Sequence, residues 1–84
     1  MKKVVVVDDD DDMRELMCML LRGRYDISSA RDGVEGLEVI REVRPDLLVL
    51  DLLMPRMHGF EVCQRLRADP ELKGTKILIS SSKS

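Results

Sequence analysis

Short runs of apolar residues recur along the chain and indicate where its strands lie. Residues 3–7 are mostly β-branched and too few for a helix, which is typical of a strand buried on both faces of a parallel sheet. Residues 46–50 carry four consecutive aliphatic side chains and predict a central strand. Residues 25–30 form a more polar strand candidate, and residues 77–79 form the last. The pattern predicts four strands.

Between these runs the apolar positions repeat with helical spacing. In the first interval they fall at i, i+3, i+4, i+7 and i+8, the stripe of an amphipathic helix, and Gly23 marks its end. Pro45 ends the second helical pattern, and Asp69-Pro70 ends the third, which starts at Gly59. The apolar positions of the three helices are Met13, Leu16, Met17, Leu20 and Leu21; Leu37, Ile40 and Val43; and Val62, Cys63 and Leu66.

Strands and helices therefore alternate from the first strand to the last. Right-handed crossovers between consecutive strands require a parallel sheet with helices on both faces. The sequence contains no internal repeat and no linker, so we expect one α/β domain over residues 1–84.

Composition and charge exclude several classes of protein. Hydrophobic residues make up 44% of the chain and charged residues 36%, as in a globular domain. The net charge is −2 with scattered Lys and Arg, so we expect no direct contact with nucleic acid or an anionic membrane. Cys18 and Cys63 lack the spacing of a zinc site. The N-terminus resembles neither a signal peptide nor a membrane span, and we expect a cytoplasmic protein.

Carboxylates follow two of the predicted strands. Asp8 and Asp9 come directly after the first strand, and Asp51 comes directly after the third. Ligands of open α/β sheets bind beyond the carboxyl ends of the strands. If these two strands are neighbours, the three acids converge and require a cation to remain ionised. Oxygen ligands without Cys or His favour Mg²⁺.

Three segments resemble consecutive signatures of response-regulator receiver domains of two-component signalling. They are V-V-D-D-D-D-D-M-R-E-L, P-D-L-L-V-L-D-L-L-M-P-R-M-H-G and R-A-D-P-E-L-K-G-T-K-I-L-I-S-S-S. The resemblance covers all 84 residues and implies a flavodoxin-like, doubly wound parallel sheet with strand order 2-1-3-4. It also implies that the family's last helix, strand and helix, including a phosphate-contacting lysine, are missing here. Lys83 does not take that role.

The resemblance assigns a role to each candidate site residue. Asp51 resembles the phosphorylated aspartate, Asp9 a direct ligand of Mg²⁺, and Asp8 an acid that acts through a metal-bound water. The backbone carbonyl of Leu53 resembles a third metal ligand. Ser81 lies where the family has a switch Ser or Thr that donates a hydrogen bond to the phosphoryl group.

Loop residues and the chain end complete the expectations from the sequence. Pro55 and Gly59 resemble the family's loop residues, whereas His58 replaces an acid that is usual there. An open strand edge at 77–79 and a helix stripe of Met17, Leu20 and Leu21 without a covering helix predict either a two-fold homodimer or a longer chain that supplies the missing elements.

The leading functional interpretation is a phosphoacceptor module that receives a phosphoryl group from a histidine kinase or a phosphotransfer protein. Such a module is not an enzyme beyond catalysing its own phosphorylation and hydrolysis. One alternative is a pseudo-receiver that only binds or dimerises. Another is a phosphatase of the haloacid-dehalogenase type, with Asp8 as nucleophile, Asp10 as acid and K-I-L-I-S as second motif.

Overall fold

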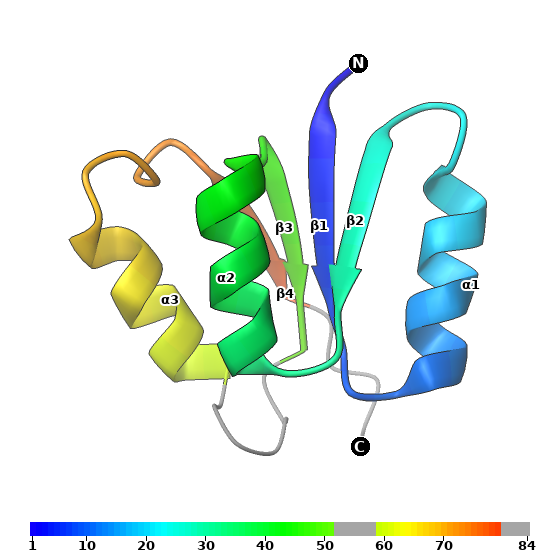
Figure 1. The fold of residues 1–84 in the computed structure, drawn as a ribbon, viewed down its shortest axis with the longest axis horizontal. Helices are drawn as coiled ribbons and strands as arrows, with labels where there is room; N and C mark the ends of the chain where they lie inside the picture. The colour runs from blue at the N-terminus through cyan, green and yellow to red at the C-terminus, as the bar shows by residue number, and fades with distance from the viewer. Residues whose placement is uncertain (52–58, 80–84) are drawn as a thin grey trace.

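The protein is a four-stranded parallel sheet with three helices, and the computed structural model describes residues 1–51 and 59–79 (Figure 1). Strands and helices alternate along the chain. They are β1 (Lys3–Val7), α1 (Asp11–Leu21), β2 (Asp26–Ala30), α2 (Gly33–Val43), β3 (Leu47–Leu50), α3 (Gly59–Ala68) and β4 (Lys76–Ile79). The strand order is β2-β1-β3-β4, which confirms the flavodoxin-like topology predicted from the sequence.

The register of the sheet aligns the ends of its central strands. Val7, the last residue of β1, lies opposite Ala30 of β2 and Leu50 of β3. All pairings are parallel, so every strand points its carboxyl end toward the same edge of the sheet. Residues that follow β1 and β3 are therefore brought together at that edge.

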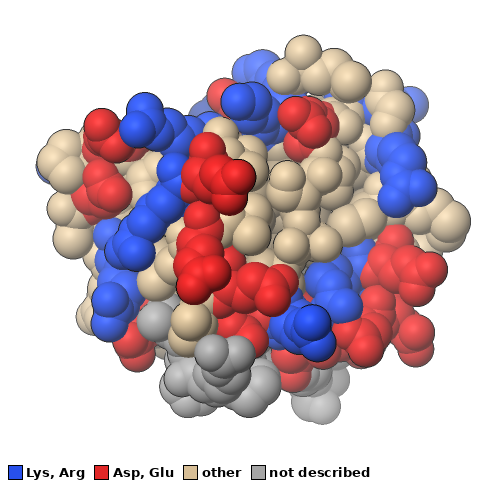
Figure 2. Space-filling model, viewed as in Figure 1, with Lys and Arg blue, Asp and Glu red and all other residues tan. Residues whose placement is uncertain are grey.

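One face of the sheet is closed by α2 and α3, which lie side by side across it (Figure 1). Alternate strand residues such as Val5 and Leu48 pack there against Ile40 of α2 and Val62 of α3, and none of these four side chains is exposed. The core is aliphatic, as expected for a chain with one Tyr and one Phe. Charged side chains of both signs cover the outer surface of this layer (Figure 2).

The opposite face is covered by α1 alone, within the part of the chain that the structure describes. Met17 and Leu21 of α1 pack against a small cluster that contains Val4, Val6 and Val49. The helix packs on β1 and β2 and does not extend over β4.

Several apolar side chains on or near that face remain in contact with solvent. Leu16 is 42% exposed, Leu20 is 65% exposed and Leu78 of β4 is 54% exposed. Only part of the apolar stripe predicted for α1 is therefore covered: Met17 and Leu21 pack against the sheet, whereas Leu16 and Leu20 do not. Self-association through this surface stays a prediction.

Local sequence signals determine where the helices begin and end. α1 starts at Asp11, two residues before the predicted stripe, because Asp10 caps it by accepting hydrogen bonds from the backbone N–H groups of the first turn. Gly23 follows its end with a φ of 94°, a conformation that L-residues rarely adopt. α2 ends at Val43, just before Arg44 and Pro45, because proline cannot continue a helix. No helix among the described residues is long and apolar enough to cross a membrane.

Candidate metal centre and phosphoacceptor site

Asp8 continues β1 beyond its last strand residue. Its backbone N–H donates to the carbonyl of Ala30 at 3.1 Å, which holds it against β2. Its carboxylate accepts a hydrogen bond of 2.9 Å from the backbone N–H of Asp10, and the residue is only 4% exposed. The carboxylate is therefore held at the carboxyl edge of the sheet before any ligand arrives.

Asp51 occupies the corresponding place after β3. Its backbone N–H donates to the carbonyl of Val7 at 3.0 Å, and the residue is 1% exposed. Since Val7 and Leu50 are register partners, Asp8 and Asp51 follow the two strands at the same level. Adjacent parallel strands thus bring together two acids that lie more than forty positions apart in the sequence.

Three carboxylates converge at this edge. Asp8, Asp9 and Asp51 each offer an oxygen, and these oxygens all lie within 4.8 Å of one another. Burial raises the pKa of the Asp8 carboxyl above 3.8, and the charges of Asp51 and Asp9 raise it further, although the hydrogen bond from Asp10 partly offsets this. The chemistry of this donor set fits a hard divalent cation, which binds carboxylate oxygens and offsets their mutual repulsion.

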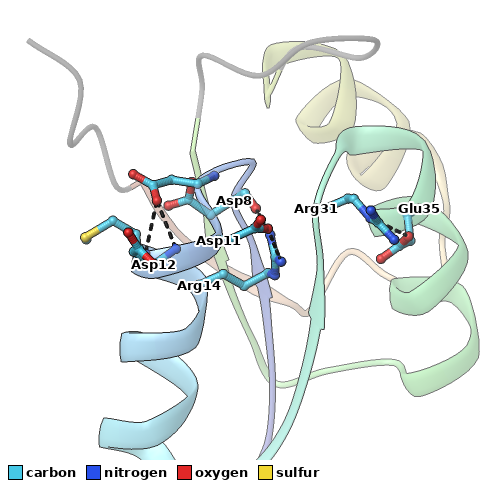
Figure 3. Close-up of polar contacts among 8 residues, drawn as sticks. Asp8, Asp11, Asp12, Arg14, Arg31 and Glu35 are labelled. Atoms are coloured by element: carbon cyan, nitrogen blue, oxygen red, sulfur yellow. Dashed lines mark hydrogen bonds and ion pairs between the residues drawn. The ribbon is translucent and has the colours of Figure 1, made fainter.

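Two residues near this cluster have roles that sequence reasoning missed. Asp10 is the cap of α1, as its place directly before the helix could have indicated. Arg14 reaches back to the acidic edge, where it donates to the backbone carbonyl of Asp8 at 2.9 Å and pairs with Asp11 (Figure 3). A basic residue two positions after a run of five acids was the available signal.

The remaining predicted site residues fall on parts of the chain that are not described. Leu53, Pro55 and His58 lie in residues 52–58, and Ser81 and Lys83 lie in residues 80–84. The roles predicted for the Leu53 carbonyl and for Ser81 stay predictions. Gly59 is described, and it is the buried first residue of α3.

Comparisons with known proteins agree with the fold. The sequence profile of the response regulator receiver domain matches residues 4–84. The chain is 40% identical over 84 residues to the DNA-binding response regulator MtrA of Mycobacterium tuberculosis, a match that covers 99% of this chain and 36% of that protein. It is 41% identical over 73 residues to hybrid signal transduction histidine kinase D of Dictyostelium discoideum, covering 87% of this chain and 5% of that protein.

Solved structures give the same result in three dimensions. The chemotaxis protein CheY4 of Vibrio cholerae superposes with a TM-score of 0.92 at 33% identity, covering 100% of this chain and 71% of that one. The N-terminal domain of a response regulator receiver protein from Methanoculleus marisnigri gives a TM-score of 0.91 at 32% identity, covering 99% and 68%. The chain belongs to the response regulator receiver domain family, whose members are signalling modules of two-component systems.

Family membership bears on the other predictions in different ways. It overturns the phosphatase alternative, and the Asp10 carboxylate assigned there as an acid instead caps α1. The chain spans about a third of the length of the MtrA relatives, which are named as DNA-binding proteins. The expectation that this chain has no direct contact with nucleic acid stays a prediction.

Proposed function

We propose that this receiver domain accepts a phosphoryl group on Asp51 in a reaction assisted by Mg²⁺. The observation that carries the proposal is the convergence of the Asp8, Asp9 and Asp51 oxygens within 4.8 Å at the carboxyl edge of a receiver fold. Structural acids are rarely buried beside other acids, because the repulsion and the loss of hydration both destabilise the folded state. A site built for a cation and an incoming phosphoryl group accounts for that cost.

Each acid has a separate task in the proposed reaction. An oxygen of the Asp51 carboxylate attacks phosphorus, the bond from phosphorus to the donor breaks, and the donor leaves with the bonding electron pair. The product is a mixed anhydride of carboxylate and phosphate on Asp51. Asp8 and Asp9 hold the cation beside it, with the Leu53 carbonyl proposed as a further ligand. Bound Mg²⁺ offsets the negative charge on the phosphoryl oxygens.

The phosphoryl donor in this proposal is a histidine kinase or a phosphotransfer protein, and the domain itself catalyses only its own phosphorylation and hydrolysis. The family supports this choice, because receiver domains are signalling modules and one relative is named as a hybrid histidine kinase. Ser81 is proposed to donate a hydrogen bond to a phosphoryl oxygen. The partner that responds to phosphorylation would then recognise the altered surface near Asp51.

Chemical phosphorylation tests the proposal without the native kinase. The chain is incubated with acetyl phosphate and Mg²⁺, and intact-mass spectrometry counts the added phosphoryl groups. We expect one added group on the unsubstituted chain, none on Asp51→Asn and strongly reduced labelling on Asp8→Asn. The matched control is Asp26→Asn, which removes an exposed acid from the amino end of β2 and should label normally.

Two outcomes would count against the proposal. Labelling that survives Asp51→Asn would mean that another residue accepts the phosphoryl group. A folded chain that is never labelled would favour the pseudo-receiver interpretation, in which the acids bind a cation without accepting phosphate.

A further inference from the structure

The side chain of Arg14 is held between two acceptors at the acidic edge (Figure 3). One guanidinium nitrogen, Nη1, donates to the backbone carbonyl of Asp8 at 2.9 Å, and the other, Nη2, pairs with the Asp11 carboxylate. The Arg14 side chain is only 20% exposed, whereas that of its partner Asp11 is 81% exposed. Most of the arginine is therefore packed into the structure, which is unusual for a surface ion pair.

Helix electrostatics alone do not account for this arrangement. Arg14 belongs to the first part of α1, and its guanidinium reaches back toward the helix N-terminus, where the helix dipole favours anions. A lone pair with the exposed Asp11 contributes little in water. The contact that distinguishes Arg14 is the one with the Asp8 carbonyl, since that group lies six residues away, outside α1 and directly after β1.

The Asp8 carbonyl belongs to the peptide that joins two of the three clustered acids. A peptide unit is planar, so a hydrogen bond to its oxygen fixes the orientation of the whole plane. The Asp8 backbone N–H is already held by Ala30, and its carboxylate is held by Asp10. The Arg14 bond adds a restraint on the C-terminal side of Asp8, at the carbonyl of the peptide that leads to Asp9. Rotation of this plane would move the Asp9 carboxylate relative to Asp8 and Asp51.

The groups that Arg14 contacts are not the clustered oxygens. Arg14 contacts a carbonyl of Asp8 and a carboxylate of Asp11, and Asp11 is not one of the three acids whose oxygens converge. Outer groups that orient the ligands of a metal commonly determine its affinity although they do not touch the ion. The guanidinium has the fixed, planar donor geometry that such a role requires.

We propose that Arg14 is a positioning residue, which fixes the Asp8–Asp9 peptide and thereby holds the two carboxylates at the spacing from Asp51 that binds a divalent cation. This inference rests on the proposed function, because it concerns the same cation site. It makes a prediction opposite in sign to simple electrostatics. Removing a positive charge near a cation site should tighten cation binding, whereas removing a positioning group should weaken it.

The test measures the dissociation constant for Mn²⁺, which takes the same oxygen ligands as Mg²⁺, from the paramagnetic resonance signal of free Mn²⁺. We expect Arg14→Met to raise the Kd about tenfold, the lower end of the effect of outer-shell substitutions. Arg31→Met is the matched control, because Arg31 follows β2 near the same edge, its side chain is 73% exposed, and it pairs with Glu35 of α2 (Figure 3). That variant should bind Mn²⁺ at least as tightly as the unsubstituted chain.

A second variant covers the case in which Arg14→Met does not fold. Arg14→Lys keeps the charge but has a single ammonium that cannot hold both acceptors in one plane, so we expect a Kd about threefold higher than that of the unsubstituted chain. Thermal unfolding followed by circular dichroism checks that each variant is folded. In the cation-free protein, the amide resonance of Asp9 should shift in both Arg14 variants and stay unchanged in Arg31→Met.

The outcomes separate the two proposals. Binding by the unsubstituted chain together with an equal or lower Kd in the folded Arg14 variants would overturn the positioning role and leave the proposed function intact. An unsubstituted chain that binds no Mn²⁺ would overturn the proposed cation site and the role of Arg14 with it.

Discussion

The two faces of the sheet are covered very differently, although the same strands supply apolar side chains to both. On the α2 and α3 face, side chains such as Leu48, Ile40 and Leu66 are completely buried in one continuous cluster. On the α1 face the buried cluster is small, and no residue of α1 is itself buried. The strands supply apolar residues to both faces, so the difference arises from the helices that cover them.

The face that contributes most to stability is also not the face on which the clustered acids lie. The α2 and α3 face carries most of the buried apolar surface and therefore most of the favourable free energy of folding. Asp8 and Asp51 each lie two residues beyond Val6 and Val49, so strand alternation directs them to the α1 side. The repelling carboxylates thus extend from the face that contributes less to stability. Substitutions on the two faces should have effects of different size.

The largest expected effect is the loss of a fully buried side chain from the α2 and α3 face. Leu48→Ala should lower the free energy of unfolding by about 2–5 kcal/mol, because it removes apolar contacts and leaves a cavity. The control on the other face is Leu20→Ala, which truncates a side chain that is 65% exposed and should change stability by less than about 0.5 kcal/mol. Urea denaturation of both variants measures the difference, and similar losses would mean that the faces contribute equally.

A smaller effect tests how closely α2 approaches the sheet. A Cβ added at Gly36 would lie 3.0 Å and 3.1 Å from the two methyl carbons of Val7, which is too close without movement. Gly36→Ala should therefore destabilise the protein by about 1 kcal/mol, because overpacking outweighs the better helix propensity of alanine. Gly74→Ala, where nothing lies within 4 Å of the added Cβ, is the control for a change of backbone freedom alone.

A double substitution sharpens this test. Val7→Ala removes the methyl groups that meet the added Cβ, so Gly36→Ala should cost less in that background than in the unsubstituted chain. Equal costs in the two backgrounds would show that the contact between α2 and β1 is not the cause.

The smallest expected effect concerns the acidic edge and depends on pH. The folded protein raises the pKa of Asp8 above 3.8, so folding favours its protonated form. Its contribution to stability is fully present below the unfolded pKa and is lost as pH rises through the folded pKa. In cation-free buffer, Asp8→Asn should therefore raise the melting temperature at pH 7 by a few degrees, and this gain should shrink as pH falls toward 3.8.

The matched control for this prediction is again Asp26→Asn, an exposed acid at the other end of the sheet. It should show no comparable gain at pH 7. A gain in Asp8→Asn that stays constant from pH 7 to acid would mean that the repulsion and burial of its charge are not responsible.

The fold and three of the site acids were predictable because their signals are local. Residues 4–7 and 47–50 are apolar without interruption, which is typical of buried parallel strands, and short connections leave few topologies. An acid directly after such a strand must lie at the carboxyl edge of the sheet. Asp8, Asp9 and Asp51 were predicted to converge if the two strands are neighbours; β1 and β3 do pair, and the three oxygens do converge.

Other features depend on contacts that the sequence does not contain. Leu20 and Leu21 both belong to the apolar stripe that the sequence predicts for α1. Leu20 is nevertheless exposed while Leu21 packs against the sheet, because α1 lies over β1 and β2 with only one side of the stripe facing them. The bond from Arg14 to the Asp8 carbonyl likewise requires a particular angle between α1 and β1. Sequence periodicity determined which elements form and placed acids directly after two of the strands. Tertiary structure decided that those strands are neighbours, which apolar residues are covered and how the acids are oriented.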